Sequence, residues 1–264
     1  MQATQARTQK LADNLRTIIS RVSAVPTSRQ VRLVAVSKLK PAAEVLALHT
    51  ATGHRHMGEN YVQELLDKAA QLPREIDWHF IGQLQTNKCR KLAEEIHNLW
   101  AVESVDTCKK ADALEKGREA LTAREPETSK LRVYVQVNTS GESSKSGCAP
   151  TDAAGIARHI RTACPHLTLQ GLMTIGSIAR SQRAFSEENE DFVLLAATAR
   201  GVEEELGLKL PEEQLELSMG MSSDFEQAIA AGATSVRVGT AIFGERRPRQ
   251  GAQAMMDVVT EQKA

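Results

Sequence analysis

The sequence predicts one α/β domain built as a closed (β/α)8 barrel, a TIM barrel, with an extra helix at its N-terminus. Eight short apolar segments alternate with longer amphipathic segments, which is the order of a parallel sheet with crossover helices. The length of 264 residues suits one such barrel, and the aromatic content of only 3% disfavours an all-β sandwich. A doubly wound open sheet is the alternative, because periodicity cannot count strands around a closed ring.

The N-terminal segment has helical periodicity. Leu11, Leu15, Ile18, Ile19 and Val22 fall on one stripe, so we expect residues 1–25 to form a helix packed on the barrel. The eight apolar segments that follow are the expected strands: Val31–Lys38, His54–Glu59, Trp78–Gly82, Leu99–Ser104, Leu131–Asn138, Leu169–Ile175, Leu215–Gly220 and Val236–Phe243. Between them, apolar residues recur at the spacing of amphipathic helices.

Residues typical of helix ends agree with this order of elements. Pro41 and Pro150 stand where helices are expected to begin, since a missing amide proton costs little there. Ser223–Glu226 has the pattern of a capping box, and Gly232 is placed to end the helix that follows. No segment is rich enough in Pro, Gly or Ser to separate domains, so residues 1–264 are expected to form a single domain.

Two of the expected connections are long. Residues 139–148 follow the fifth strand and residues 176–188 follow the sixth. Both lie on the face of the barrel that carries active sites, so we expect mobile functional loops there.

Composition excludes several classes of partner. Lys plus Arg and Asp plus Glu each number 33, so the formal net charge is zero and nothing favours nucleic acid. No apolar run is long enough to cross a membrane. The four cysteines are widely spaced without a C-x-x-C pair, which indicates reduced thiols and a cytoplasmic protein. Basic residues near the N-terminus leave a mitochondrial presequence as the minor alternative.

Lys38 ends the first expected strand, where a barrel builds its active site. Burying an ammonium group is costly, so a lysine in such a place tends to lose its proton. A neutral lysine amine is the nucleophile of Schiff-base chemistry. The alternative is an ordinary surface lysine in a strand-to-helix turn.

Small and hydroxylic residues follow the last two strands. Loops after strands seven and eight of a barrel often form a phosphate site, and Ser218, Gly239 and Thr240 supply hydroxyls and close backbone approach. Ser222 and Ser223 could instead cap a helix, and for Ser223 we favour the helix cap.

Arg237 is a charged residue in the middle of an apolar strand. It alternates with Val236 and Val238, so it faces the opposite side of the sheet, toward the barrel interior. A guanidinium cannot discard its charge and must find an acceptor there. Glu216 is the structural candidate, and an acceptor nitrogen on a bound heterocycle is the functional one.

Other polar residues collect at the same strand ends. Asn60 follows the second strand, His79 lies between two aromatic residues of the third, and Thr174 lies in the sixth. His54 and His56 are two residues apart, but no third ligand has a sensible spacing, so we expect no metal site.

A lysine amine, a phosphate cradle and a strand arginine are the parts needed to hold pyridoxal 5′-phosphate (PLP). The sequence also resembles the pyridoxal phosphate homeostasis protein family, over segments that run in order from about residue 31 to residue 244. These segments are Ala35–Pro41, Gly58–Glu64, Trp78–Lys88, Val137–Asn138, Ser144–Gly147, Gly171–Thr174, Ser218–Ser222 and Val236–Gly244. Met57 departs from the pattern, because an aromatic residue is expected at this position.

The resemblance implies a fold-type III barrel like the N-terminal domain of alanine racemase, with PLP as the cofactor. It implies an aldimine at Lys38, a phosphate near Ser218 and Gly239–Thr240, and Arg237 near the pyridine nitrogen. Asn60 and His79 complete the expected cofactor-binding set. A guanidinium beside the ring nitrogen disfavours its protonation, which makes the ring a weaker electron sink.

The implied function is intracellular PLP homeostasis, with apo PLP-dependent enzymes as partners, no substantial turnover and a monomeric state. The alternative is a PLP-dependent amino-acid racemase or a related PLP enzyme. Racemisation needs a second acid/base, usually a tyrosine from a further domain, and the chain has only Tyr61 and Tyr134. A class I aldolase-like barrel is a third reading, disfavoured because its lysine usually lies on a later strand than that of Lys38.

Overall fold

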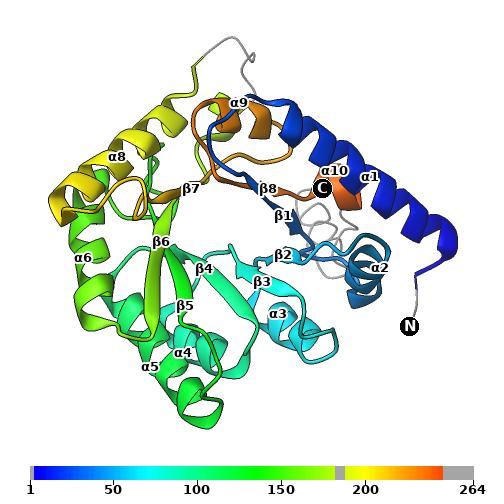
Figure 1. The fold of residues 1–264 in the computed structure, drawn as a ribbon, viewed down its shortest axis with the longest axis horizontal. Coiled ribbons are helices and arrows are strands. Elements are labelled where there is room, and N and C mark those ends of the chain that lie inside the picture. The colour runs from blue at the N-terminus through cyan, green and yellow to red at the C-terminus, as the bar shows by residue number, and fades with distance from the viewer. Residues whose placement is uncertain (1–2, 182–187, 246–264) are drawn as a thin grey trace, which may run out of the picture.

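Eight parallel strands close into a barrel in the computed structural model, which describes residues 3–181 and 188–245 (Figure 1). Each strand pairs with the next, and the first pairs with the last, so the open doubly wound sheet is excluded. The strands are β1 Arg32–Val36, β2 His56–Glu59, β3 Asp77–Phe80, β4 Leu99–Val105, β5 Leu131–Gln136, β6 Leu167–Met173, β7 Glu216–Ser218 and β8 Ser235–Val238.

Helices surround the strand ring (Figure 1). They are α1 Gln5–Ala24, α2 Ala42–Thr52, α3 Val62–Ala69, α4 Thr86–Glu95, α5 Cys108–Arg124, η1 Pro150–Asp152, α6 Ala153–Ala163, α7 Ile178–Ser181, α8 Glu190–Leu206, α9 Phe225–Ala230 and α10 Thr240–Phe243. None of these described helices is long and apolar enough to cross a membrane.

The extra N-terminal helix is confirmed as α1. The side chain of Thr4 caps it by accepting a hydrogen bond from the amide of Arg7. Its apolar stripe is buried except for Ile19, which is exposed, and the helix packs against α2, α9 and α10. Asn14 Nδ2 donates to the carbonyl of Ile242 at 2.9 Å. The helix therefore covers the place where the first and last units of the barrel meet.

Most strands are shorter than the sequence predicts, and for β1 and β8 the difference bears on the expected site residues. β1 ends at Val36, so Lys38 lies in the turn between β1 and α2. β8 ends at Val238, and the rest of the expected eighth strand is the short helix α10, whose amides bond back to Gly239 and Thr240. An apolar run that continues from a strand into a buried helix keeps one hydropathy signal throughout, so the sequence does not reveal the change.

The predicted capping box at Ser223 is wrong. Asp224 is the N-cap residue of α9, and its Oδ1 accepts a hydrogen bond from the amide of Met221 at 2.6 Å instead of capping the helix. The end of this helix is confirmed, because Gly232 has φ +100° and its amide bonds to Ile229 O.

The two long connections contact each other. Lys145 Nζ donates to Gly176 O at 2.8 Å, and the hydroxyls of Thr139 and Thr174 lie 2.9 Å apart. Cys148 returns the first loop to β5 through a bridge with Val137. Loop 139–148 is thus held at both ends. Residues 182–187 of the second connection lie outside the described residues, as do both ends of the predicted 1–264 domain.

Candidate functional site

A cavity of about 240 Å³ lies at the carboxyl ends of β1, β3, β7 and β8. This is the end of a barrel where active sites are built. Residues from four separate loops and strand ends line it: Val36, Lys38, Ile81, Met221, Ser222, Ser223, Arg237, Gly239 and Thr240. The fold therefore brings the predicted lysine, the predicted arginine and two predicted phosphate ligands into one cavity, which we call the Lys38 cavity.

Ser222 joins the two loops that the sequence associates with phosphate. The chain turns after β7 at Gly220, which has φ +92° and whose carbonyl accepts from the amide of Arg237 at 3.0 Å. Ser222 Oγ then accepts from the amide of Gly239 at 3.3 Å. Gly239 itself lies tightly against β1, because a Cβ there would come within 3.2 Å of Val36 O.

Ser218 and His79 do not line the Lys38 cavity. Both are fully buried in the barrel interior, and Ser218 Oγ already accepts from Arg237 and donates to Glu103. Ser222 and Ser223 are the serines that the structure places at the cavity. The sequence signal that distinguishes them is the end of β7, since side chains beyond a strand end project into the loops above the barrel.

Asn60 lies in the turn after β2, close to the turn after β3. A Cβ at Gly82 would come within 2.0 Å of Asn60 O, so the two turns touch through their backbones. Asn60 Oδ1 is buried and finds no hydrogen-bond partner within the described residues. A buried acceptor without a donor is the kind of atom that a bound group satisfies.

The turn that carries Lys38 is held on both sides. Ser37 Oγ donates to Glu59 Oε1 at 2.6 Å, and the amide of Leu39 donates to Glu64 Oε1 at 2.7 Å. Leu39 has φ +62°, a left-handed conformation that costs a leucine free energy and persists only where its surroundings impose it.

Lys68 connects these supports. Lys68 is 5% exposed, and its ammonium donates to Glu59 Oε1 at 2.6 Å, Glu64 Oε1 at 2.7 Å and Ser37 O at 2.9 Å. Burial raises the pKa of Glu59 to about 7, opposed by the charge of Lys68. We call Ser37, Glu59, Glu64 and Lys68 the Lys68 cluster; it fixes the backbone on either side of Lys38.

Arg237 extends from the Lys38 cavity into the barrel interior. Its guanidinium donates to Ser218 Oγ at 2.6 Å and to Thr174 O at 2.7 Å. Burial lowers the pKa of Arg237, and the nearby carboxylates of Glu103 and Asp224 oppose that shift. An arginine keeps its charge in such surroundings.

The sequence suggests Glu216 as the structural partner of Arg237, and this suggested pairing is wrong. Glu216 binds Arg32 Nη1 at 2.5 Å, the hydroxyl of Tyr134 at 2.7 Å and Gln170 Nε2 at 2.7 Å. Arg32 and Glu216 are the first residues of their strands, so this group lies toward the amino-terminal end of the barrel, and Glu103 is the carboxylate near Arg237.

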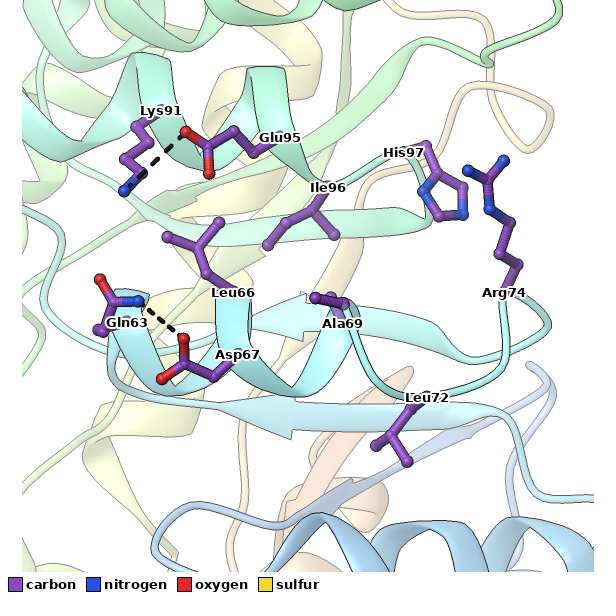
Figure 2. A pocket seen from close by; sticks show the side chains of 11 residues that line it. Gln63, Leu66, Asp67, Ala69, Leu72, Arg74, Lys91, Glu95, Ile96 and His97 are labelled. Atoms are coloured by element: carbon purple, nitrogen blue, oxygen red, sulfur yellow. Dashed lines mark hydrogen bonds and ion pairs between the residues drawn. The ribbon is translucent and has the colours of Figure 1, made fainter.

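A larger cavity of about 470 Å³ lies outside the barrel wall between α3 and α4 (Figure 2). Its polar groups largely pair with one another, as Gln63 with Asp67 and Lys91 with Glu95. Burial and the nearby charge of Arg74 lower the pKa of His97, whose Nε2 has no partner in the described part of the chain. This cavity lies on the helical shell, away from the strand ends, so the Lys38 cavity is the candidate site.

The structure gathers one group of metal-ligand types that the sequence does not reveal. Side-chain atoms of Asp112, His159 and Cys164 lie within 4.8 Å of one another. His159 Nε2 and Asp112 Oδ1 are 2.6 Å apart, as in an ion pair between α5 and α6. Burial raises the pKa of Cys164 to about 12, which disfavours the thiolate that a metal requires.

Comparison with known proteins identifies the family. The family model described as alanine racemase, N-terminal domain, matches residues 7–247. The pyridoxal phosphate homeostasis protein of Schizosaccharomyces pombe is 44% identical over 229 residues, which cover 87% of this chain and 90% of the relative. The chain belongs to the pyridoxal phosphate homeostasis protein family.

Other members of this family are similar over most of their length. The human pyridoxal phosphate homeostasis protein is 46% identical over 224 residues, covering 82% of this chain and 77% of the relative. PipY of Synechococcus elongatus, solved with PLP bound, is 32% identical with a TM-score of 0.70, covering 89% of this chain and all of PipY. The resemblance that the sequence motifs indicate is thereby confirmed.

Proposed function

We propose that this protein binds PLP in the Lys38 cavity and takes part in intracellular PLP homeostasis. The observation that carries the proposal is the cavity itself, which collects a lysine amine, a guanidinium and three hydroxyl side chains at the strand ends. The names of the curated relatives and the PLP in PipY support it.

The residues of the cavity fit the parts of PLP. When bound, PLP supplies an aldehyde that a primary amine can attack and a ring that can act as an electron sink. Lys38 offers the amine, and Ser222 and Thr240 offer hydroxyls for the phosphate beside Gly239. Arg237 puts a fixed positive charge at the same cavity, which disfavours a proton on a neighbouring ring nitrogen.

The same residues support a carrier with little turnover. Within the described residues no tyrosine lines the cavity: the hydroxyl of Tyr134 donates to Glu216, and Tyr61 is exposed before α3. A racemase needs a second acid/base of that kind opposite the lysine. The function proposed is therefore storage and delivery of PLP to apo-enzymes by a monomer.

The state of the cysteines supports a cytoplasmic place of action. All four are free thiols, and burial raises the pKa of Cys89, Cys148 and Cys164 to about 12 each. Such inert thiols are typical of a reducing compartment.

The proposed function predicts stoichiometric PLP binding without amino-acid turnover. Purified protein loaded with PLP should restore activity to an apo PLP enzyme, since an open site allows exchange with another amine. Incorporation of solvent deuterium at the α-carbon of L-alanine should be far slower than about 1 per second. Lys38-dependent exchange at enzymatic rates would contradict the carrier and support the racemase.

Ser222→Ala should weaken PLP affinity about tenfold, as expected for the loss of one hydrogen bond to a charged phosphate. Ser235→Ala is the matched control, because Ser235 is a buried serine at the start of β8 that does not line the cavity. That variant should keep the wild-type affinity for PLP. The measurements are PLP titration by fluorescence and thermal denaturation of the apo variants. A loss of affinity in Ser218→Ala larger than that in Ser222→Ala would return the phosphate to Ser218.

A further inference from the structure

A chain of hydrogen-bonded polar side chains crosses the barrel interior below the Lys38 cavity. His56 Nδ1 lies 3.0 Å from His79 Nε2, and His79 Nδ1 lies 2.7 Å from Glu103 Oε1. Ser218 Oγ donates to Glu103 Oε2 at 2.5 Å and accepts from Arg237 at 2.6 Å. The chain thus connects β2, β3, β4, β7 and β8 and ends on a residue that lines the cavity.

Glu103 is the acceptor at the centre of this chain. Its side chain is 0% exposed, and each of its two oxygens has one partner, His79 or Ser218. A serine hydroxyl has one proton and two lone pairs, so Ser218 can accept from Arg237 while it donates its proton to Glu103. By taking that proton, the carboxylate orients the Ser218 hydroxyl with a lone pair toward Arg237.

We propose that Glu103 is a positioning residue of the cofactor site: acting through Ser218, its carboxylate fixes the Arg237 guanidinium against the Lys38 cavity and balances its positive charge. The inference rests on the proposed function, because the cavity beside Arg237 is where PLP would bind. It adds a residue from β4, a strand that contributes no side chain to the cavity lining.

The electrostatics of the interior favour this role. Burial alone would raise the pKa of Glu103, but the hydrogen bond from His79 and the charge of Arg237 hold it below its ordinary value. The carboxylate therefore stays ionised beside a buried guanidinium. A buried cation that loses its counter-ion is strongly destabilised and raises the positive potential around it.

Other charged groups face Glu103 and Arg237, and they determine which control variant is suitable. Asp224 faces Arg237 from the segment before α9, and Arg32 and Tyr134 face Glu103 from β1 and β5. Glu216 is a second carboxylate of the barrel interior, paired with Arg32 and without a contact to Ser218 or Arg237. Replacing Glu216 therefore removes a barrel carboxylate while leaving Arg237 supported.

The test compares Glu103→Gln with Glu216→Gln. With PLP added, we expect the pH midpoint of the visible absorption band of Glu103→Gln to shift by about one unit to lower pH. Arg237 then keeps only Asp224 of the two carboxylates named above, so its charge disfavours a cationic amine at the cavity more strongly. Glu216→Gln should lose stability but keep the wild-type midpoint. An unchanged midpoint in a folded Glu103→Gln protein would overturn the proposal.

A second readout works without PLP. The side-chain N–H resonances of Arg237, assigned by their loss in Arg237→Lys, should exchange slowly with solvent in apo wild type and rapidly in Glu103→Gln. If Glu103→Gln fails to fold, Ser218→Ala keeps both charges, breaks the link and should speed the same exchange. Wild-type exchange rates in that variant would contradict the inference. A wild type with no visible band but protected Arg237 resonances would contradict the proposed function alone.

Discussion

Lys38→Ala should abolish the covalent retention of PLP while leaving the fold intact. Among the described residues Lys38 is the one lysine that lines the candidate cavity, and only a primary amine can hold the cofactor through its aldehyde. The turn around it is fixed by Ser37 and Leu39 through Glu59 and Glu64, so its backbone does not depend on the lysine side chain. Wild type should therefore retain PLP covalently, and Lys38→Ala should retain none.

Borohydride reduction followed by mass spectrometry measures this result. Wild type should gain one pyridoxyl group, located at Lys38 by peptide mapping, and Lys38→Ala should gain none. Lys40→Ala and Lys88→Ala are the matched controls, since Lys40 Nζ donates to Glu245 O and neither residue lines the cavity. A label found mainly on Lys40 or Lys88 would place the cofactor elsewhere. Circular dichroism should be the same for all three variants.

The barrel and the place of Lys38 at its strand ends could be predicted because their signals are local. Alternation of apolar and amphipathic segments predicts the eight units, and the position of Lys38 after the first apolar run predicts its place at the strand ends. Arg237 is recognisable because a charge in an apolar strand must find an acceptor. Each of these inferences needs only neighbouring residues.

Two features of the site could not be predicted from the sequence: which residue ends each strand, and which side chains meet across the closed barrel. Ser218 and Ser222 are four residues apart, and only the end of the three-residue strand β7 separates an interior serine from a cavity serine. Glu103 carries the same signal as Arg237, a charge in an apolar strand, yet strand order alone does not show which carboxylate a guanidinium meets across a closed barrel. The structure selects Glu103 over Glu216, because Ser218 bonds to both Glu103 and Arg237 whereas Glu216 pairs with Arg32.

The burial of Lys68, on a helix, could not be predicted from the sequence either. On α3 it follows Leu65 and Leu66 and has the pattern of an exposed helix lysine. Its burial follows from Glu59 at the end of β2 and Glu64 one helical turn earlier, which together supply enough acceptors for an ammonium. A buried lysine of this kind is recognisable only when both carboxylates are placed in space.

Lys68→Met should destabilise the protein by about 3–5 kcal/mol at alkaline pH, where an ionised Glu59 would be a buried carboxylate without its counter-ion. Lys91→Met is the matched control. Lys91 lies on the surface of α4, 3.9 Å from Glu95, so its loss should cost less than about 1 kcal/mol. Urea denaturation of the apo proteins measures both values.

The pH dependence of the Lys68→Met defect identifies its cause. The pKa of Glu59 is already raised to about 7 by burial, and without Lys68 it should rise further. A carboxyl with a raised folded-state pKa binds a proton that the unfolded chain has released, so its contribution to stability is lost as pH rises from its ordinary value toward the folded value. Both proteins hold the Glu59 proton below about pH 7, so the gap in stability between wild type and Lys68→Met should be small up to that pH and widen above it. A pH-independent gap would mean that Lys68 contributes through packing and hydrogen bonds to Ser37 rather than through the charge of Glu59.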